Sequence, residues 1–360
     1  MTISRRQFAF TMLASLGLMS SIWTNPVFAE DAPKVALIMK SLANEFFQSM
    51  EEGAKAHQKE NAAQYSLVTN GIKDETDTAA QIKILEQMVA QKVNAIMIAP
   101  ADSKALVPAI KAAVDKGVLV VNIDNQLDQD ALKDKGLVVP FVGPDNRAGA
   151  KLVGDYVAKQ LKEGDKVAII EGVSTTFNAQ QRTAGYKDAM EAAKITVVGV
   201  QSGNWEIDGG NKVTSAFLRE NPDLKAVLAG NDSMAIGAVA AIKAAGKVGT
   251  VLVGGYDNIS AVKPLLTDGS LLATADQFGS KQAVFGIEVA LKAIADKQSQ
   301  NDMQAQVKTD VVLGKGFVQQ KDWDNDDKFF ADFDEESASD YEDRNVFKII
   351  DYSKDRIGFA

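Results

Sequence analysis

The chain has 360 residues, a formal net charge of −9 and no cysteine, and 46% of its residues are hydrophobic. The lack of cysteine excludes a disulfide framework and a lipid-modified cysteine, while the apolar content is enough for a proper core. Lysine and arginine are spread through the chain, so nucleic acid is not expected as a partner, and the length favours two domains.

The N-terminal residues have the pattern of an export signal. Arg5 and Arg6 precede an apolar stretch from about Phe8 to Trp23, and Val27–Ala29 offers small residues where a signal peptidase reads. The stretch is too short and too interrupted by Ser and Thr for a stable transmembrane helix, although a retained anchor is the alternative. We predict a signal peptide over residues 1–29, cleaved after Ala29, and a periplasmic protein. The adjacent arginines favour the twin-arginine route.

The rest of the chain alternates short apolar runs with helical patterns. Most runs are continuous, which is typical of strands buried on both faces of a parallel sheet. The predicted strands are Val35–Met39, Tyr65–Thr69, Ala95–Ala99, Val118–Ile123, Val138–Val142, Val167–Ile170, Thr196–Val200, Ala226–Ala229, Val251–Gly254 and Leu271–Thr274. The clearest predicted helices are Asn44–Glu60, Thr78–Ala90, Ser103–Lys116 and Ser233–Ala245.

The alternation breaks once, after Asp124. The segment Asn125–Gly136 is polar and has no convincing helical pattern, and the alternation restarts at Val138. We interpret this segment as a crossing between two similar lobes. The predicted fold class is α/β, with a doubly wound parallel sheet in each lobe.

Polar and aromatic side chains follow the predicted strands at their carboxyl ends, where open parallel sheets bind ligands. The candidate site residues are Lys40, Asn44, Phe46, Phe47, Asp124, Asn125, Arg182, Trp205, Asn231, Asp257 and Gln277. Carboxylates and amides suit a polyhydroxylated ligand, because each hydroxyl both donates and accepts, and aromatic rings suit the C–H faces of a sugar. The alternative for Asp and Asn at strand ends is an ordinary turn or helix cap, and for at least one of Phe46 and Phe47 it is core packing.

Five segments together carry a resemblance to a known family. They are Lys34–Phe47 (KVALIMKSLANEFF), Ile98–Ser103 (IAPADS), Val121–Asp124 (VNID), Ala229–Ala238 (AGNDSMAIGA) and Val253–Asp257 (VGGYD). In this order they resemble the ribose-binding branch of the periplasmic sugar-binding proteins that serve ABC importers. The resemblance extends from about Lys34 to Phe317 and implies the type I periplasmic binding protein fold, in which a three-strand hinge joins two lobes.

The resemblance also implies a site, a domain arrangement and a function. The family's ligand contacts fall on Asn44, Phe46, Phe47, Asp124, Arg182, Trp205, Asn231, Asp257 and Gln277. The N-terminal lobe is expected to comprise residues 30–144 and 278–306, and the C-terminal lobe residues 145–277 and 307–318, with crossings near Pro144, Phe278 and Gln306. The expected protein is a monomeric, non-enzymatic binding protein without a cofactor or metal, which delivers a sugar or sugar alcohol to an ABC permease.

Two residues depart from the ribose-binding pattern. Lys40 stands where ribose binders usually carry a small hydroxyl residue, and Asn125 stands where they usually carry arginine. Lys40 could donate to hydroxyls or hold a carboxylate, and a solvated lysine at a strand end is the alternative. A hexose, a sugar alcohol or a sugar acid is therefore expected in preference to ribose.

The segment 319–360 lies beyond the resemblance and is rich in acidic and aromatic residues. We predict a flexible acidic tail, partly docked by its aromatic side chains. Asp322, Asp324 and Asp326 have the spacing of the first ligands of a calcium loop, but Asp327 and Phe333 occupy positions that need Gly and Glu.

Other proteins could use the same scaffold. A sugar-responsive transcription regulator would need a helix-turn-helix where this chain has an export pattern. An exported α/β enzyme acting on a small carbohydrate would turn its sugar over, yet the only histidine, His57, lies on a predicted helix far in sequence from the site residues. A ligand carrier for a chemoreceptor is compatible with transport.

Overall fold

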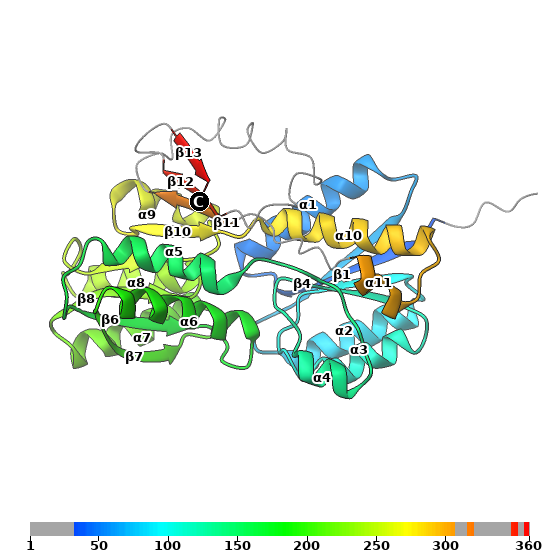
Figure 1. The fold of residues 1–360 in the computed structure, drawn as a ribbon, viewed down its shortest axis with the longest axis horizontal. Helices are drawn as coiled ribbons and strands as arrows, with labels where there is room; N and C mark the ends of the chain where they lie inside the picture. The colour runs from blue at the N-terminus through cyan, green and yellow to red at the C-terminus, as the bar shows by residue number, and fades with distance from the viewer. Residues whose placement is uncertain (1–31, 307–314, 320–346, 352–355, 360) are drawn as a thin grey trace, which may run out of the picture. The chain divides into compact units, whose positions relative to one another are not determined.

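The computed structural model describes residues 32–306, 315–319, 347–351 and 356–359 (Figure 1). The predicted signal peptide and the calcium-like spacing lie outside these residues. All that follows concerns the unit that begins at Ala32. None of the helices in the described ranges is long and apolar enough to cross a membrane.

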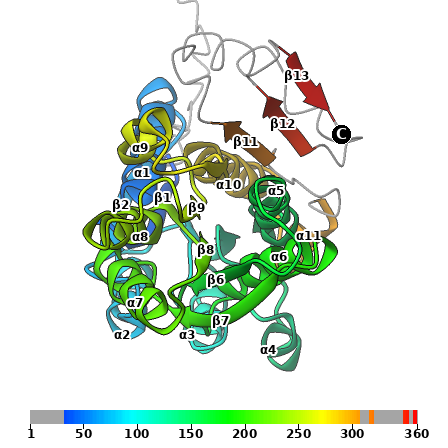
Figure 2. The same ribbon diagram turned by 90° about the vertical axis from the view of Figure 1, so that its left-hand side faces the viewer.

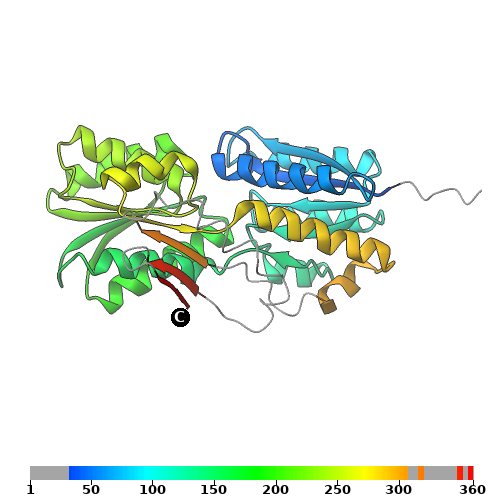
Figure 3. The same cartoon turned by 90° about the horizontal axis from the view of Figure 1, so that it is seen from above.

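The first sheet has five parallel strands in the order β2-β1-β3-β4-β5. The strands are β1 (Lys34–Ser41), β2 (Ser66–Ile72), β3 (Ala95–Ile98), β4 (Leu119–Ile123) and β5 (Phe141–Val142). The helices that belong to it are α1 (Glu45–Glu60), α2 (Thr78–Ala90), α3 (Val107–Val114), α4 (Gln129–Asp134), α10 (Gly279–Ala295) and α11 (Gln300–Gln306). Helix α10 comes late in the chain, yet it lies beside α1 and packs on β3 and β4 (Figure 3).

The second sheet is parallel over the order β7-β6-β8-β9-β10 and continues through β11, β12 and β13. Its strands are β6 (Lys166–Glu171), β7 (Thr196–Ser202), β8 (Leu224–Ala229), β9 (Leu252–Gly254), β10 (Ala273–Asp276), β11 (Lys315–Gln319), β12 (Phe347–Asp351) and β13 (Arg356–Phe359). Its helices are α5 (Asn146–Ala158), α6 (Phe177–Ala192), α7 (Ile207–Glu220), α8 (Asp232–Ala244), the 3-10 helix η1 (Ser260–Val262) and α9 (Lys263–Asp268). The α5–α6 pair and the α7–α8 pair flank β6 and β8 on opposite sides (Figure 2).

Burial on both faces explains why the apolar runs predicted strands correctly. In β1, Val35, Leu37 and Met39 pack in a cluster with α1 and α10, while Ala36 and Ile38 pack with α2 and α3 on the other face. Burying an aliphatic side chain of this size contributes about 1.5–3 kcal/mol, so both faces of the strand must be apolar. The predicted α/β fold with two parallel-sheet lobes is confirmed.

The interpretation of Asn125–Gly136 as a crossing between lobes is wrong. Helix α4 forms within this segment, where the Asp128 carboxylate accepts a hydrogen bond from the Ala131 N–H at 2.8 Å. Strand β5 then pairs with β4 and remains in the first sheet. A helix of six residues is too short to display a repeating apolar pattern, which is why the sequence did not reveal it.

The chain passes to the second sheet only after β5, and it returns to the first after β10, where α10 begins. The passage from α11 to β11 runs through residues 307–314, which lie outside the described ranges. The predicted lobe boundaries therefore stay predictions. Strands β12 and β13 lie inside the segment 319–360, where the sequence did not predict strands.

Candidate functional site

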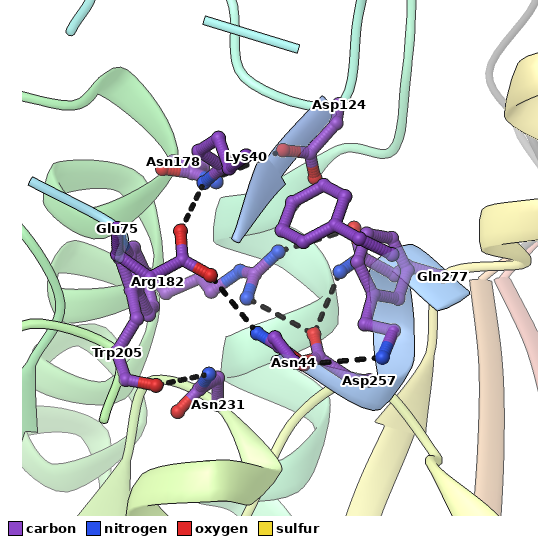
Figure 4. A pocket seen from close by; sticks show the side chains of 12 residues that line it. Lys40, Asn44, Glu75, Asp124, Asn178, Arg182, Trp205, Asn231, Asp257 and Gln277 are labelled. Atoms are coloured by element: carbon purple, nitrogen blue, oxygen red, sulfur yellow. Dashed lines mark hydrogen bonds and ion pairs between the residues drawn. The ribbon is translucent and has the colours of Figure 1, made fainter. Parts of the chain in front are cut away.

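Strand ends and helix starts from both sheets meet at one pocket (Figure 4). The pocket is lined by Lys40, Asn44, Phe46, Phe47, Glu75, Asp124, Asn178, Arg182, Trp205, Asn231, Asp257 and Gln277. The cavity among these side chains has a volume of about 10 Å³, roughly that of one water-sized sphere. A sugar can therefore enter only when the lining side chains or the lobes move apart.

Unusual backbone conformations at chain turns help to form the pocket. Asp124, Trp205 and Asp257 have φ angles of 62°, 67° and 121°, all in the region that non-glycine residues rarely adopt. Such a conformation costs on the order of 1 kcal/mol or more per residue. Each of these residues follows a strand of one of the sheets and contributes its side chain to the pocket lining.

Asn44 and Asn231 line the pocket and also cap helices. The Asn44 Oδ1 atom accepts from the Phe46 N–H at 3.1 Å, and its Nδ2 donates to Glu75 Oε1 at 3.2 Å. The Asn231 Oδ1 atom accepts from the Met234 N–H at 2.9 Å, and its Nδ2 donates to the Trp205 carbonyl at 3.1 Å. Each asparagine can therefore cap a helix and line the pocket at once, because the capping hydrogen bond fixes the position of its side-chain amide.

The Lys40 ammonium lies between two buried carboxylates. Its Nζ is 3.6 Å from Glu75 Oε2 and 3.5 Å from Asp124 Oδ2, and the Lys40 side chain is 3% exposed. It also lies 5.3 Å from the Phe47 ring centroid and 5.4 Å from that of Trp205, within the range of cation–π attraction. Lys40 is therefore a pocket residue, and the alternative of a solvated lysine is wrong.

Arg182 forms the second charged centre of the pocket. Its Nη1 is 3.3 Å from Asp257 Oδ1, and its Nη2 donates to Gln277 Oε1 at 3.1 Å. Gln277 Nε2 in turn donates to Asp257 Oδ1 at 2.6 Å. Further donation to Asn146 Oδ1 and to the Gly230 carbonyl leaves the guanidinium held on several sides, over the ring of Tyr256. These contacts hold the Asp257 and Gln277 side chains in place in the absence of a ligand.

Burial dominates the acidity of the pocket carboxyls. Loss of water raises the pKa of Glu75 to about 7, against the opposing attraction of Lys40. Burial likewise raises the pKa of Asp257 to about 7, although Arg182 opposes it. Carboxyls of this kind can act as acceptors when ionised and as donors when protonated.

Three buried polar atoms of the pocket residues have no hydrogen-bond partner: Glu75 Oε2, Asp124 Oδ2 and Trp205 Nε1. Buried polar atoms are normally hydrogen-bonded, so such a group calls for an explanation. Two carboxylate acceptors and one indole donor together match the hydroxyls of a small polar ligand. Within the described part of the chain, no group of three or more His, Asp or Glu side chains is arranged to hold a metal ion.

Comparison with known families shows that residues 35–298 match the family described as a periplasmic binding protein domain. The chain belongs to this family. The resemblance to the sugar-binding members of ABC importers is confirmed by its relatives. A D-ribose/D-allose-binding protein of Pseudomonas aeruginosa is 61% identical over 312 residues, which are 86% of this chain and 97% of that protein.

Solved structures of other periplasmic binding proteins agree with this assignment. An ABC transporter periplasmic solute binding protein of Actinobacillus succinogenes with bound D-allose is 35% identical, with a TM-score of 0.70 over 76% of this chain and 99% of that one. An ABC transporter solute binding protein of Burkholderia multivorans with an unknown ligand is 69% identical, with a TM-score of 0.74 over 74% of this chain and 95% of that one.

In this periplasmic binding protein, ten of the eleven predicted site residues line the pocket. Asn125 does not; its Nδ2 donates to the Pro100 carbonyl at 2.9 Å, and its Oδ1 accepts from the Asn178 N–H at 3.1 Å. Glu75 and Asn178 were not predicted. Glu75 follows β2 as the other acids follow their strands, and Asn178 lies four residues before Arg182 on α6, so the available signals were strand-end position and helical spacing.

Proposed function

We propose that the protein captures a neutral monosaccharide or related polyol in this pocket and delivers it to the permease of an ABC importer. The observation that carries the proposal is a set of buried atoms without a hydrogen bond in a pocket built from both lobes: Trp205 Nε1, and the Glu75 and Asp124 oxygens that have only an ion pair with Lys40. Family membership supports a binding role without catalysis, and the protein is proposed to act as a monomer.

D-Ribose and D-allose are the first candidate ligands. Both are named for the relative from Pseudomonas aeruginosa, and D-allose is bound in the structure from Actinobacillus succinogenes. The expectation that Lys40 disfavours ribose gains no support from these names.

Charge argues for a neutral ligand. The Lys40 ammonium already has two carboxylates within 3.6 Å, and Arg182 is engaged by Asp257. A sugar acid would add a further negative charge to a buried site whose lining has three carboxyl groups and two cationic side chains. Because such repulsion is strong at low dielectric constant, sugar acids become the least favoured of the expected ligands.

Entry of the sugar requires the lobes to separate and then to close, as two-lobed binding proteins do by hinge bending. On closure, residues of the first sheet such as Lys40 and Asp124 would meet one side of the sugar. Arg182 and Asp257 from the second sheet would meet the other. Hydroxyls would then donate to the Glu75 and Asp124 oxygens that lack a hydrogen bond, and the aromatic side chains would cover the C–H faces.

Export is also part of the proposal. Residues 1–29 would direct the chain to the periplasm by the twin-arginine route, with cleavage after Ala29. Intact-mass measurement of protein from the periplasmic fraction is expected to give a chain that begins at Glu30. A cytoplasmic protein that keeps Met1 would contradict the proposed signal.

A thermal-shift screen tests the binding function. Pentoses, hexoses, alditols and sugar acids are added separately, and a bound sugar raises the free energy of unfolding by RT ln(1 + [L]/Kd). D-Ribose or D-allose is expected to give the largest shifts and the sugar acids the smallest. A flat screen over all neutral sugars would contradict the proposal, and conversion of a bound sugar into product would favour the enzyme alternative.

A further inference from the structure

Helix α6 carries the pocket residues Asn178 and Arg182, yet it has no cap of its own. Its N-cap residue Thr176 makes no capping hydrogen bond, and the Thr176 hydroxyl donates to the Val173 carbonyl instead. Helices α1, α2, α4, α5 and α8, in contrast, are each capped by their own residue: Asn44, Asp77, Asp128, Asp145 and Asn231. The Ala179 N–H donates to Asn178 Oδ1 at 2.9 Å within the helix, but the N–H groups of Phe177 and Asn178 must find acceptors elsewhere.

Two acceptors come from the loops of the first sheet. The Ser103 hydroxyl accepts from the Phe177 N–H at 2.9 Å, and Asn125 Oδ1 accepts from the Asn178 N–H at 3.1 Å. Ser103 is 5% exposed and Asn125 is fully buried, so these bonds are shielded from water. Side chains of one lobe thus cap the N-terminus of a helix of the other lobe.

The loop that carries Asn125 is itself held firmly. Asn122 Nδ2 donates to the Asn125 carbonyl at 2.8 Å, and Asn122 Oδ1 accepts from the Leu127 N–H at 2.8 Å. Asp124, the pocket residue beside Lys40, is the direct neighbour of Asn125. One short loop therefore contributes a ligand-facing carboxylate and a cap acceptor, and one helix start contributes a ligand-facing arginine and the capped N–H groups.

A second contact follows the same principle at the start of η1. The N-cap residue of η1, Ile259, makes no side-chain cap. The Glu45 carboxylate, at the first turn of α1, accepts from the Ser260 N–H at 2.9 Å and from the Ala261 N–H at 3.0 Å. Glu45 belongs to the lobe of the first sheet, and η1 follows β9 of the second.

We propose that Ser103 and Asn125, assisted by Glu45, are positioning residues that cap helices across the lobe interface and so couple sugar capture to closure. The inference rests on the proposed function, because it assumes an open form in which these N–H groups are hydrated. Water replaces the caps only when the lobes part, so the caps favour the closed form over the open one. A contact shifts the equilibrium between two conformations by the difference in its free energy between them.

The test compares Ser103→Ala with the parent protein by titration calorimetry with D-ribose and with D-allose, and by melting with and without sugar. The change removes the interlobe acceptor of the Phe177 N–H and also the donation of the Ser103 hydroxyl to the Gln126 carbonyl, at 2.8 Å within the first lobe. We expect Kd to rise about threefold to tenfold, and the melting temperature to fall modestly without sugar and further with it. Ser103→Thr keeps the hydroxyl and should restore the parental Kd. Glu45→Ala should raise Kd independently of Ser103→Ala.

Asp128→Ala is the matched control, because Asp128 caps α4 within its own lobe. It should lower the melting temperature equally with and without sugar and leave Kd unchanged. If Ser103→Ala behaves like Asp128→Ala, or if it binds as tightly as the parent, the cross-lobe role is overturned.

A sugar-independent measurement separates this inference from the proposed function. The chain has no cysteine, so spin labels can be placed through Lys116→Cys and Lys225→Cys, at exposed positions of the two lobes. In the sugar-free protein, Ser103→Ala is expected to lower the fraction of molecules with the short label distance of the closed form and to raise the fraction with the long distance of the open form. Identical distance distributions in the parent and Ser103→Ala would overturn the proposal that these caps favour closure. Failure of the parent to bind any neutral sugar of the thermal-shift screen would overturn the proposed function alone.

Discussion

Replacing Asp257 by alanine is expected to weaken sugar binding by at least about 30-fold, the largest effect of any single change in the pocket. Asp257 Oδ1 holds both the Arg182 guanidinium, at 3.3 Å, and the Gln277 amide, at 2.6 Å. Truncation removes a ligand acceptor and leaves a buried arginine without its counter-charge. The ligand hydroxyl and the Arg182 guanidinium each lose an acceptor, and a buried donor left unpaired costs about 1–3 kcal/mol, more when it is charged. Titration calorimetry on the folded variant measures the effect.

Asp188→Ala is the matched control for this change. Asp188 lies on α6, the helix of Arg182, and pairs with Arg147 at 2.7 Å, but both side chains of that pair are partly exposed. A surface pair contributes little, so the Kd of Asp188→Ala should equal that of the parent. Asp124→Ala should lose about 1–3 kcal/mol of binding free energy, because only one acceptor disappears. Parental affinity in both Asp257→Ala and Asp124→Ala would refute the assigned site.

Replacing Lys40 by methionine is expected to lower the free energy of unfolding by about 3–5 kcal/mol near pH 8. The change removes the only cation within 4 Å of Glu75 and Asp124 in the described residues and leaves two buried carboxylates without that counter-charge. Chemical denaturation at several pH values, with the sugar absent, measures the loss.

The pH dependence identifies the cause of this loss. Burial raises the pKa of Glu75 from its ordinary value of 4.5 to about 7 in the folded protein, so this group leaves the folded state most stable at low pH, where the carboxyl is protonated. That contribution disappears as the pH rises through about 7. Without the Lys40 ammonium the pKa of Glu75 rises further, so the variant should lose less stability at pH 5.5 than at pH 8. In the double variant Lys40→Met/Glu75→Gln, the loss of stability at pH 8 should approach that at pH 5.5. An equal loss at both pH values in Lys40→Met alone would contradict the ion-pair explanation.

The positions of the site residues followed from strand ends, whereas their side-chain environment did not. Asp124 and Asn125 are neighbours with similar strand-end signals, but the turn at Asp124, with its φ of 62°, places one in the pocket and the other against Pro100 and α6. No local pattern distinguishes them, since the distinction depends on a helix more than 50 residues later in the chain.

The burial of Lys40 also could not be predicted from the local sequence. Its place at the end of β1 is readable from the sequence, but its burial depends on Glu75, which follows a different strand. A lysine is seldom buried without a partner, and the partner is defined only by the pairing of β1 with β2. Helix α4 escaped prediction for a different reason, because its single capped turn carries too few apolar residues to show a period.

The central claim is that a neutral sugar occupies the pocket formed by Lys40, Asp124, Arg182 and Asp257. The most direct test is calorimetric titration of the mature protein with D-allose, alone and in the presence of saturating D-ribose. We predict one binding site per chain, competition between the two sugars, and loss of both signals in Asp257→Ala. Absence of binding by these two and by every other neutral sugar of the screen, or binding that persists unchanged in Asp257→Ala, would contradict the claim.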